Sequence, residues 1–199
     1  MANKSIIIAT KNEGKAREFI ELFDNYGYQV KTLLDFPDIE DVEETGQTFA
    51  ENALIKADAI SKQFNTIVLA DDSGLEVDAL DGGPGIYSAR YAGEHGNDAK
   101  NNLKLLEALN DVPMPERKAN FHCSLVLVGP NRDPLTVEGT VDGYILTEPR
   151  GENGFGYDPL FYVTEVDKGM AELTSKEKNE ISHRAKAIKQ LEGYLDDWL

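Results

Sequence analysis

The sequence predicts an α/β protein, because short β-branched stretches alternate with segments whose apolar residues recur at helical spacing. Residues 5–9 (Ser-Ile-Ile-Ile-Ala) are typical of a first strand, and the apolar residues between 16 and 23 fall on one face of a helix that follows it. A second apolar run covers residues 67–70. Residues 121–128 and 135–146 are rich in β-branched side chains and predict antiparallel strands.

A polar turn joins the first predicted strand to its helix, and it consists of Thr10, Lys11, Asn12, Glu13, Gly14 and Lys15. A strand, a turn that contains glycine and then a helix present backbone N–H groups to an anion. Lys11 and Lys15 would add positive charge there. The turn lacks the spacing of a Walker loop, and a capped helix start with solvated lysines is an equally good interpretation.

An acidic run at residues 38–46 follows the short strand predicted at 29–33. Most such runs are solvated loops. This one stops at Thr48-Phe49-Ala50-Glu51, a capping-box pattern that predicts the start of a buried helix. Glu43 or Glu44 therefore lies in a connection from which it could offer a metal ligand.

The central feature of the chain is a pair of adjacent carboxylates, Asp71 and Asp72, on which the apolar run at 67–70 is expected to end. Ser73 and Gly74 follow. Ends of strands are where α/β proteins place their chemistry. Two carboxylates buried together are costly to ionise unless a cation or hydrogen-bond donors lie between them, and magnesium would supply that charge. A solvated Asp-Asp-Ser-Gly turn is the alternative.

Residues 97–109 carry apolar residues at helical spacing and predict a further helix. The strands that follow it are expected to be broken at 129–131 and at 141–143, where each segment contains a glycine. Beyond them, residues 149–161 place glycines on both sides of Phe155. An aromatic ring on so permissive a backbone could lie against a flat ligand such as a purine, and a core position for Phe155 is the equal alternative.

The last predicted helix begins after Ser182, a good N-cap residue, and its apolar face runs from Ile188 to Trp198. His183 and Arg184 then lie in its first turn, where positive side chains oppose the helix dipole. Ligand binding would explain this arrangement, and a surface pair without function is the alternative.

Composition excludes several classes of protein. The chain has 199 residues and one cysteine, Cys123, so it forms no intramolecular disulfide, and Cys123 is expected to be a small buried hydrophobe. The apolar runs are too short for a secretory signal or a membrane span, so we expect a cytoplasmic protein. A formal net charge of -16 would repel a nucleic acid backbone, although small phosphorylated ligands remain open.

Four stretches in this order closely resemble the Ham1/RdgB family of inosine triphosphate pyrophosphatases: residues 10–15, 43–53, 70–90, and 155–158 with 182–184. The similarity runs from about Ile6 to about Leu195. It implies a two-lobed α/β fold of the Maf/Ham1 type, built around a long, curved mixed sheet with flanking helices. It also implies a single domain over residues 1–199, an active cleft between the two lobes and a homodimer.

The resemblance further implies an enzyme that uses magnesium to hydrolyse purine nucleoside triphosphates, namely ITP, dITP and XTP, to the monophosphate and pyrophosphate. Such an enzyme removes noncanonical, deaminated purines before they enter nucleic acid. Two alternatives remain: a related pyrophosphatase of the Maf type with another base preference, and a purine nucleotide sensor without catalytic activity.

Residue by residue, Asp72 matches the family's catalytic aspartate, and Glu43 matches its partner in holding magnesium. Thr10 to Lys15 look like the triphosphate-binding loop, with Lys15 as the most direct charge contact, although Lys11 stands where many members have glycine. Ser73 looks like a substrate contact. The remaining substrate-binding positions implied by the resemblance are Phe155, Gly156, Tyr157, Asp158, Lys178, His183 and Arg184.

Overall fold

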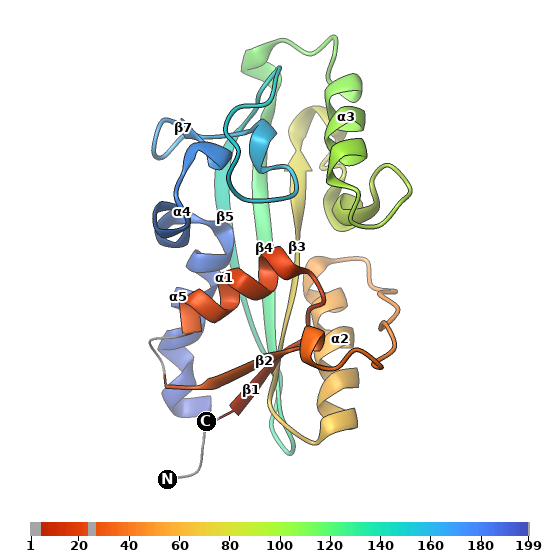
Figure 1. Ribbon diagram of the computed structural model, residues 1–199, viewed down its shortest axis with the longest axis vertical. Helices are drawn as coiled ribbons and strands as arrows, with labels where there is room; N and C mark the ends of the chain where they lie inside the picture. Colours follow the sequence, from red (N-terminus) through yellow and green to blue (C-terminus); the bar gives the residue numbers. More distant parts are fainter. Residues whose placement is uncertain (1–4, 24–26, 199) are drawn as a thin grey trace. The chain divides into compact units, whose positions relative to one another are not determined.

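The computed structural model describes residues 5–23 and 27–198 (Figure 1). Its contacts divide the chain into two units. Unit 1 comprises residues 1–72, 123–138 and 187–199, and unit 2 comprises residues 73–122 and 139–186. Within the described ranges, no helix is long and apolar enough to span a membrane.

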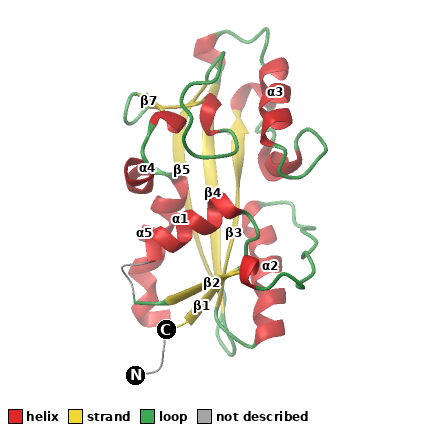
Figure 2. Cartoon of the chain, in the orientation of Figure 1, coloured by secondary structure: helices red, strands yellow, loops and turns green. Residues whose placement is uncertain are grey.

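A single seven-stranded sheet has the order β2-β1-β3-β4-β5-β6-β7 (Figure 2). Strand β1 pairs in parallel with β2 and with β3, whereas β5, β6 and β7 pair antiparallel, so the sheet is mixed. The strands are β1 (Ser5–Ile8), β2 (Gln29–Thr32), β3 (Val68–Val77), β4 (Lys118–Val128), β5 (Leu135–Ile145), β6 (Phe161–Val163) and β7 (Lys168–Gly169). The α-helices are α1 (Glu13–Phe23), α2 (Phe49–Phe64), α3 (Asp98–Ala108), α4 (Ser175–Ile181) and α5 (His183–Trp198).

In unit 1, helices cover both faces of the sheet. Alternate residues of a strand point to opposite faces. Ile6 and Ile8 of β1 pack in a cluster with residues of α1 and α5, whereas Ile7 packs in a second cluster with residues of α2. Leu69 of β3 belongs to the first cluster and Val68 to the second. Strands buried on both faces explain the continuous apolar runs in the sequence.

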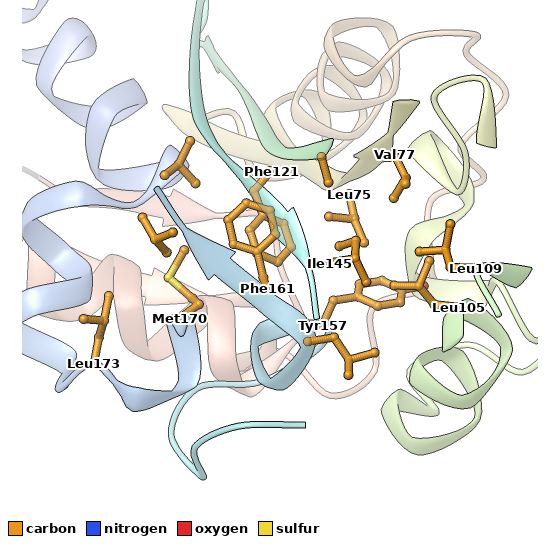
Figure 3. Packing of buried hydrophobic residues seen from close by; sticks show 14 residues of the cluster. Leu75, Val77, Leu105, Leu109, Phe121, Ile145, Tyr157, Phe161, Met170 and Leu173 are labelled. Carbon is orange, nitrogen blue, oxygen red and sulfur yellow. The ribbon is translucent and has the colours of Figure 1, made fainter. Parts of the chain in front are cut away.

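Unit 2 has a core of its own, shown in Figure 3. The rings of Phe121 and Phe161 lie against each other with centroids 4.4 Å apart. Leu105 of α3 and Leu109, which follows that helix, are fully buried in the same cluster. This packing fixes α3 to the sheet residues of its unit.

Two sequence-based boundaries are wrong. Strand β3 does not end at the two aspartates but continues to Val77, because Leu75 and Val77 keep burying side chains in the core of unit 2. Likewise β5 runs without a break through residues 141–143, where Val141 and Gly143 point inward and Asp142 outward. In both places the alternation of buried residues outweighs the turn propensity of Ser-Gly or Asp-Gly.

Candidate active site

The polar turn before α1 is stabilised by its own side chains. The Thr10 hydroxyl accepts a hydrogen bond from the Asn12 N–H at 3.1 Å, and the Asn12 side-chain oxygen accepts one from the Lys15 N–H at 2.9 Å. This is the geometry of a capped helix start. Lys11 is exposed and pairs with Asp41 at 2.8 Å, while Glu13 is also exposed.

Lys15 extends from the first turn of α1 to Asp71 of β3. Its Nζ lies 2.5 Å from an Asp71 oxygen, and the Asp71 side chain is fully buried. The other Asp71 oxygen accepts a hydrogen bond from the Cys123 thiol at 3.0 Å. Cys123 is buried as expected, but its role as a donor to Asp71 was not predicted. Asp71 therefore holds the lysine that was predicted to contact phosphate.

Asp72 differs from its neighbour because it forms no ion pair with any of the described residues. Its residue is 6% exposed, and none of the described residues forms a hydrogen bond with its Oδ2. Burial is the main cause that raises the pKa of this carboxyl to about 6. The positive charges of Lys15 and Lys56 lower this pKa, whereas the negative charge of Glu44 raises it. Alternation along β3 places Asp72 on the side that α2 covers, with Val68 and Ala70.

Lys56 of α2 connects the acidic loop to the aspartates. Its Nζ lies 2.5 Å from a Glu44 oxygen and donates to the Asp71 backbone carbonyl at 3.1 Å. Glu44 is half-buried, and its charge acts on Asp72, whereas Glu43 is exposed. The two glutamates that the sequence left as alternatives therefore occupy different environments.

This arrangement suits a magnesium ion. Within residues 5–23 and 27–198, no three His, Cys, Asp or Glu side chains gather as a ready-made metal site. Magnesium does not need one, because it is commonly bound by one or two carboxylates together with water and substrate phosphates. The buried oxygen of Asp72 and the half-buried Glu44 are donors of the right chemistry. A cation beside Asp72 would also offset the cost of burying its charge.

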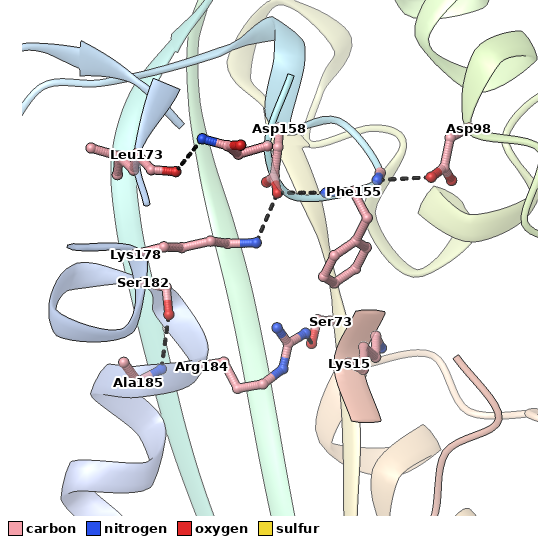
Figure 4. A network of polar contacts seen from close by, with 12 residues as sticks. Lys15, Ser73, Asp98, Phe155, Asp158, Leu173, Lys178, Ser182, Arg184 and Ala185 are labelled. Atoms are coloured by element: carbon pink, nitrogen blue, oxygen red, sulfur yellow. Dashed lines mark hydrogen bonds and ion pairs between the residues drawn. The ribbon is translucent and has the colours of Figure 1, made fainter. Parts of the chain in front are cut away.

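In unit 2, the predicted base-binding segment is held by a buried ion pair (Figure 4). Lys178 donates to Asp158 at 2.8 Å, and both side chains are buried. The same Asp158 oxygen accepts the Phe155 N–H at 2.9 Å. The Lys178 ammonium also lies 4.6 Å from the centre of the half-buried Phe155 ring. Phe155 is thus neither a core residue nor freely exposed.

The same segment contacts α3. Gly156 has a φ of +61°, its N–H donates to Asp98 at 2.9 Å, and its carbonyl accepts from Asn102 at 2.9 Å. Tyr157 is buried, and its hydroxyl donates to the Ser88 carbonyl at 2.7 Å. Burial raises the pKa of Tyr157, with smaller contributions from Tyr91 and Asp98. The Tyr157 hydroxyl therefore anchors the segment.

His183 and Arg184 begin α5, and the Ser182 hydroxyl accepts the Ala185 N–H at 3.1 Å as an N-cap should. The His183 ring stacks on Phe121 with centroids 5.0 Å apart. Arg184 is only 1% exposed, and its Nη2 donates to the Ser73 hydroxyl at 3.2 Å. Among the predicted residues, the structure thus brings Arg184 to Ser73.

Sequence reasoning missed the residues that support the site: Asp71 as the partner of Lys15, Lys56 as the partner of Glu44, and Asp98 with Asn102. Lys56 carried a usable signal, because it lies three positions after Ala53 and four before Ile60, two buried residues of α2. The contacts of Asp98 and Asn102 join segments that are more than fifty positions apart in the sequence. No local sequence pattern predicts such contacts.

The Ham1 family model matches residues 6–194. The chain belongs to the Ham1 family. It is 57% identical to the dITP/XTP pyrophosphatase of Bacillus cereus over 98% of this chain and 96% of that protein. It is 60% identical to the dITP/XTP pyrophosphatase of Geobacillus kaustophilus over 98% of this chain and 95% of that one.

Solved structures agree with this assignment. The Staphylococcus aureus Ham1 protein superposes with a TM-score of 0.85 at 48% identity, covering 98% of this chain and 99% of its own. A nucleoside-triphosphatase / dITP/XTP pyrophosphatase from Mycobacterium abscessus gives 0.76 at 43% identity, covering 94% and 98%. The predicted α/β fold and the resemblance to the family are both confirmed.

Proposed function

We propose that this protein hydrolyses ITP, dITP and XTP to the nucleoside monophosphate and pyrophosphate. The proposal is carried by Asp72, a buried carboxylate near two lysines that has an oxygen without a hydrogen bond from the described residues. It is supported by near full-length relatives that are named dITP/XTP pyrophosphatases. A protein of this kind removes deaminated purines from the nucleotide pool.

Unit 1 carries the residues for the triphosphate. An ammonium group has three donors, so Lys15 can keep its ion pair with Asp71 and still donate to a phosphate oxygen. Glu13 and Gly14 add backbone N–H groups in the first turn of α1, where the helix dipole favours an anion. Asp71 thus keeps Lys15 oriented before the substrate arrives.

We assign magnesium to Asp72 and to Glu44, since Lys56 joins the half-buried Glu44 to the backbone carbonyl of Asp71, the residue before Asp72, whereas Glu43 is exposed. When bound, the ion supplies positive charge to phosphate oxygens and acidity to a bound water. The sequence instead predicts Glu43 as the magnesium ligand beside Asp72. Asp72 next to a cation is ionised and is a weak base, so its main task is to orient the attacking water and the phosphates rather than to take up a proton.

Unit 2 carries the residues for the base. Hypoxanthine and xanthine present a 6-oxo acceptor, whereas adenine presents an amino donor. Arg184, with only donors, and His183 in the same turn favour the 6-oxo group and leave adenine with an unpaired contact. A site built on such a hydrogen bond discriminates by several powers of ten. Phe155 offers a ring on which the purine can stack.

The first test is incubation with ITP, XTP, dITP, ATP, GTP and dTTP in the presence of magnesium, with products separated by ion exchange. We expect monophosphate and pyrophosphate from the first three substrates only. A preference for dTTP would support the Maf-type alternative. Diphosphate and orthophosphate would place the attack at the terminal phosphate, and no turnover would support a nucleotide sensor.

Two matched variants test the metal ligands. Glu44→Gln should raise the magnesium concentration needed for half-maximal activity, whereas Glu43→Gln, which alters an exposed side chain, should leave it near the wild-type value. The reverse result would restore Glu43 as the ligand and would overturn the assignment of Glu44.

We also propose that the protein acts as a homodimer in the cytoplasm, as the family resemblance implies. Sedimentation velocity measures the assembly directly. A single species with the mass of one 22.0 kDa chain at micromolar concentration would contradict it.

A further inference from the structure

We infer that Asp98 and Asn102 are positioning residues that clamp the base-binding segment, residues 155–158, and thereby set the selectivity of the enzyme for its base. The inference rests on the proposed function. It concerns two residues of α3 that no sequence motif singled out, and it explains how a glycine-rich segment keeps a defined shape.

The clamp holds both polar groups of a single residue. Asp98 accepts the Gly156 N–H at 2.9 Å, and Asn102 donates its side-chain amide to the Gly156 carbonyl at 2.9 Å. Residues four apart lie on the same face of a helix, so α3 presents the two side chains together. The backbone of Gly156 is therefore fixed from one side by one rigid element.

Gly156 needs such support because of its conformation. Its φ of +61° lies in the left-handed region, which glycine reaches easily and also leaves easily. On one side of it, the Phe155 N–H is tied to Asp158, and on the other side the Tyr157 hydroxyl is tied to Ser88. With Gly156 clamped as well, the peptide that orients the Phe155 ring has little freedom left.

Helix α3 is itself well anchored. Asn97 caps it by accepting the Lys100 N–H at 3.1 Å. Leu105 is fully buried in the core of unit 2, and Asn101 bonds the Ala92 N–H at 2.8 Å and the Ala89 carbonyl at 3.2 Å. A helix fixed at its start, middle and end can transmit a fixed position to the segment that it holds.

The consequence for chemistry is alignment of the base. A purine stacked on Phe155 meets the donors of Arg184 only if the ring plane is held in place. If the ring is loosened, stacking still occurs, but the hydrogen bond that separates hypoxanthine from adenine weakens. Binding of the favoured base then falls more than binding of the rejected one.

The test compares Asp98→Ala, Asn102→Ala and the double variant with wild type, using steady-state kinetics for ITP and ATP. Loss of a charge-assisted hydrogen bond should raise KM for ITP by about tenfold and lower the ITP-to-ATP ratio of kcat/KM by a similar factor. We expect kcat for ITP to change little, because Asp72 and Lys15 are untouched. Asp98→Asn keeps an acceptor oxygen and should recover most of the loss.

The matched control is Lys104→Ala on the same helix. Lys104 donates to the Tyr91 carbonyl at 2.6 Å, so the variant removes an α3 contact that does not involve Gly156. It should leave KM and the base preference unchanged. If Lys104→Ala changed KM and base preference as much as Asp98→Ala, or if Asp98→Asn did not restore them, Asp98 would only stabilise the helix in general. Either result would overturn the inference.

Hydrogen exchange separates failure of this inference from failure of the proposed function. The Gly156 amide should exchange faster in Asp98→Ala than in wild type, whatever the enzyme hydrolyses. If exchange is unchanged, the clamp is refuted. If wild type does not hydrolyse ITP, the proposed function fails, and with it the link between clamp and selectivity, even where exchange confirms the clamp.

Discussion

Asp72 in unit 1 and Asp158 in unit 2 are both buried carboxylates, but they differ in the partners that surround them. Asp158 in unit 2 is 3% exposed and accepts both the Lys178 ammonium and the Phe155 N–H. Asp72 in unit 1 is 6% exposed, and its Oδ2 has no hydrogen-bond partner among the described residues. The two carboxylates are buried to a similar extent, but only Asp158 has hydrogen-bond and ion-pair partners for its buried oxygen among the described residues.

The difference shows how burial serves two purposes. A buried charge with complete partners rigidifies its surroundings, which suits a segment that is proposed to recognise a flat base. A buried charge with incomplete partners has a perturbed pKa and a strong demand for a cation, which suits chemistry on phosphates. Rigid recognition and reactive chemistry are therefore built from the same residue type.

The largest expected effect comes from removing the charge of Asp72. Asp72→Asn should lower kcat for ITP by about a thousandfold or more, since positioning of metal and water contributes on that order. Nucleotide binding should be largely retained. Asp78→Asn, an exposed aspartate just beyond the end of the same strand, is the control and should stay active. An active Asp72→Asn enzyme would remove Asp72 from the mechanism.

The second effect tests how much the buried ion pair between Lys178 and Asp158 contributes to the stability of the fold. Lys178→Met leaves Asp158 buried without its cation and should lower the free energy of unfolding by about 3–5 kcal/mol. Lys168→Met breaks the exposed pair with Glu177 and should lower the free energy of unfolding far less, because solvent screens that pair. Urea unfolding measures both. Equal losses would show that burial does not distinguish the two lysines.

The third effect concerns stability and pH at Asp72. Its folded-state pKa of about 6 exceeds the ordinary value of 3.8, so the folded state binds the proton more tightly, and stability falls as pH rises between these values. Without magnesium, Asp72→Asn should raise the free energy of unfolding at pH 7.5 by up to about 3 kcal/mol. The gain should be absent near pH 3.8. A loss of stability at pH 7.5 would mean that the charge of Asp72 is already compensated.

The smallest effect compares Gly156 of the base-binding segment with Gly154, which precedes that segment. Gly154 and Gly156 both have positive φ, but a Cβ at Gly154 would collide with the Asp158 carboxylate, whereas a Cβ at Gly156 meets nothing within 4 Å. Gly156→Ala should cost about 1 kcal/mol of stability through backbone strain, and Gly154→Ala about 1–2 kcal/mol more. Thermal unfolding distinguishes the two variants. Identical melting temperatures would contradict the prediction that Asp158 fills the space beside Gly154.

Local patterns predicted much of the fold. The apolar runs located β1 and the start of β3, and the caps at Thr48 and Ser182 placed the starts of α2 and α5, because these signals depend on neighbouring residues only. The aspartates were misplaced at a strand end, because the residues that extend β3 gain their burial from a core assembled from distant parts of the chain.

The same limit applies to the site. The motif residues could be named from the sequence, but their partners could not. That Lys15 is held by Asp71, and Asp71 by Cys123, depends on strand pairing and helix packing that join distant positions. Adjacent aspartates look equivalent in a sequence, and only the alternation of β3 assigns them different neighbours.

The chain crosses between the units four times, after Asp72, His122, Glu138 and Lys186, so neither unit is encoded by a continuous stretch of the gene. Unit 1 includes most of α5, which follows the other described helices in the sequence and covers one face of the strands of this unit. During translation, Lys15, Asp71 and Asp72 leave the ribosome before α5 does. The core of unit 1 therefore closes around these residues only after α5 has emerged.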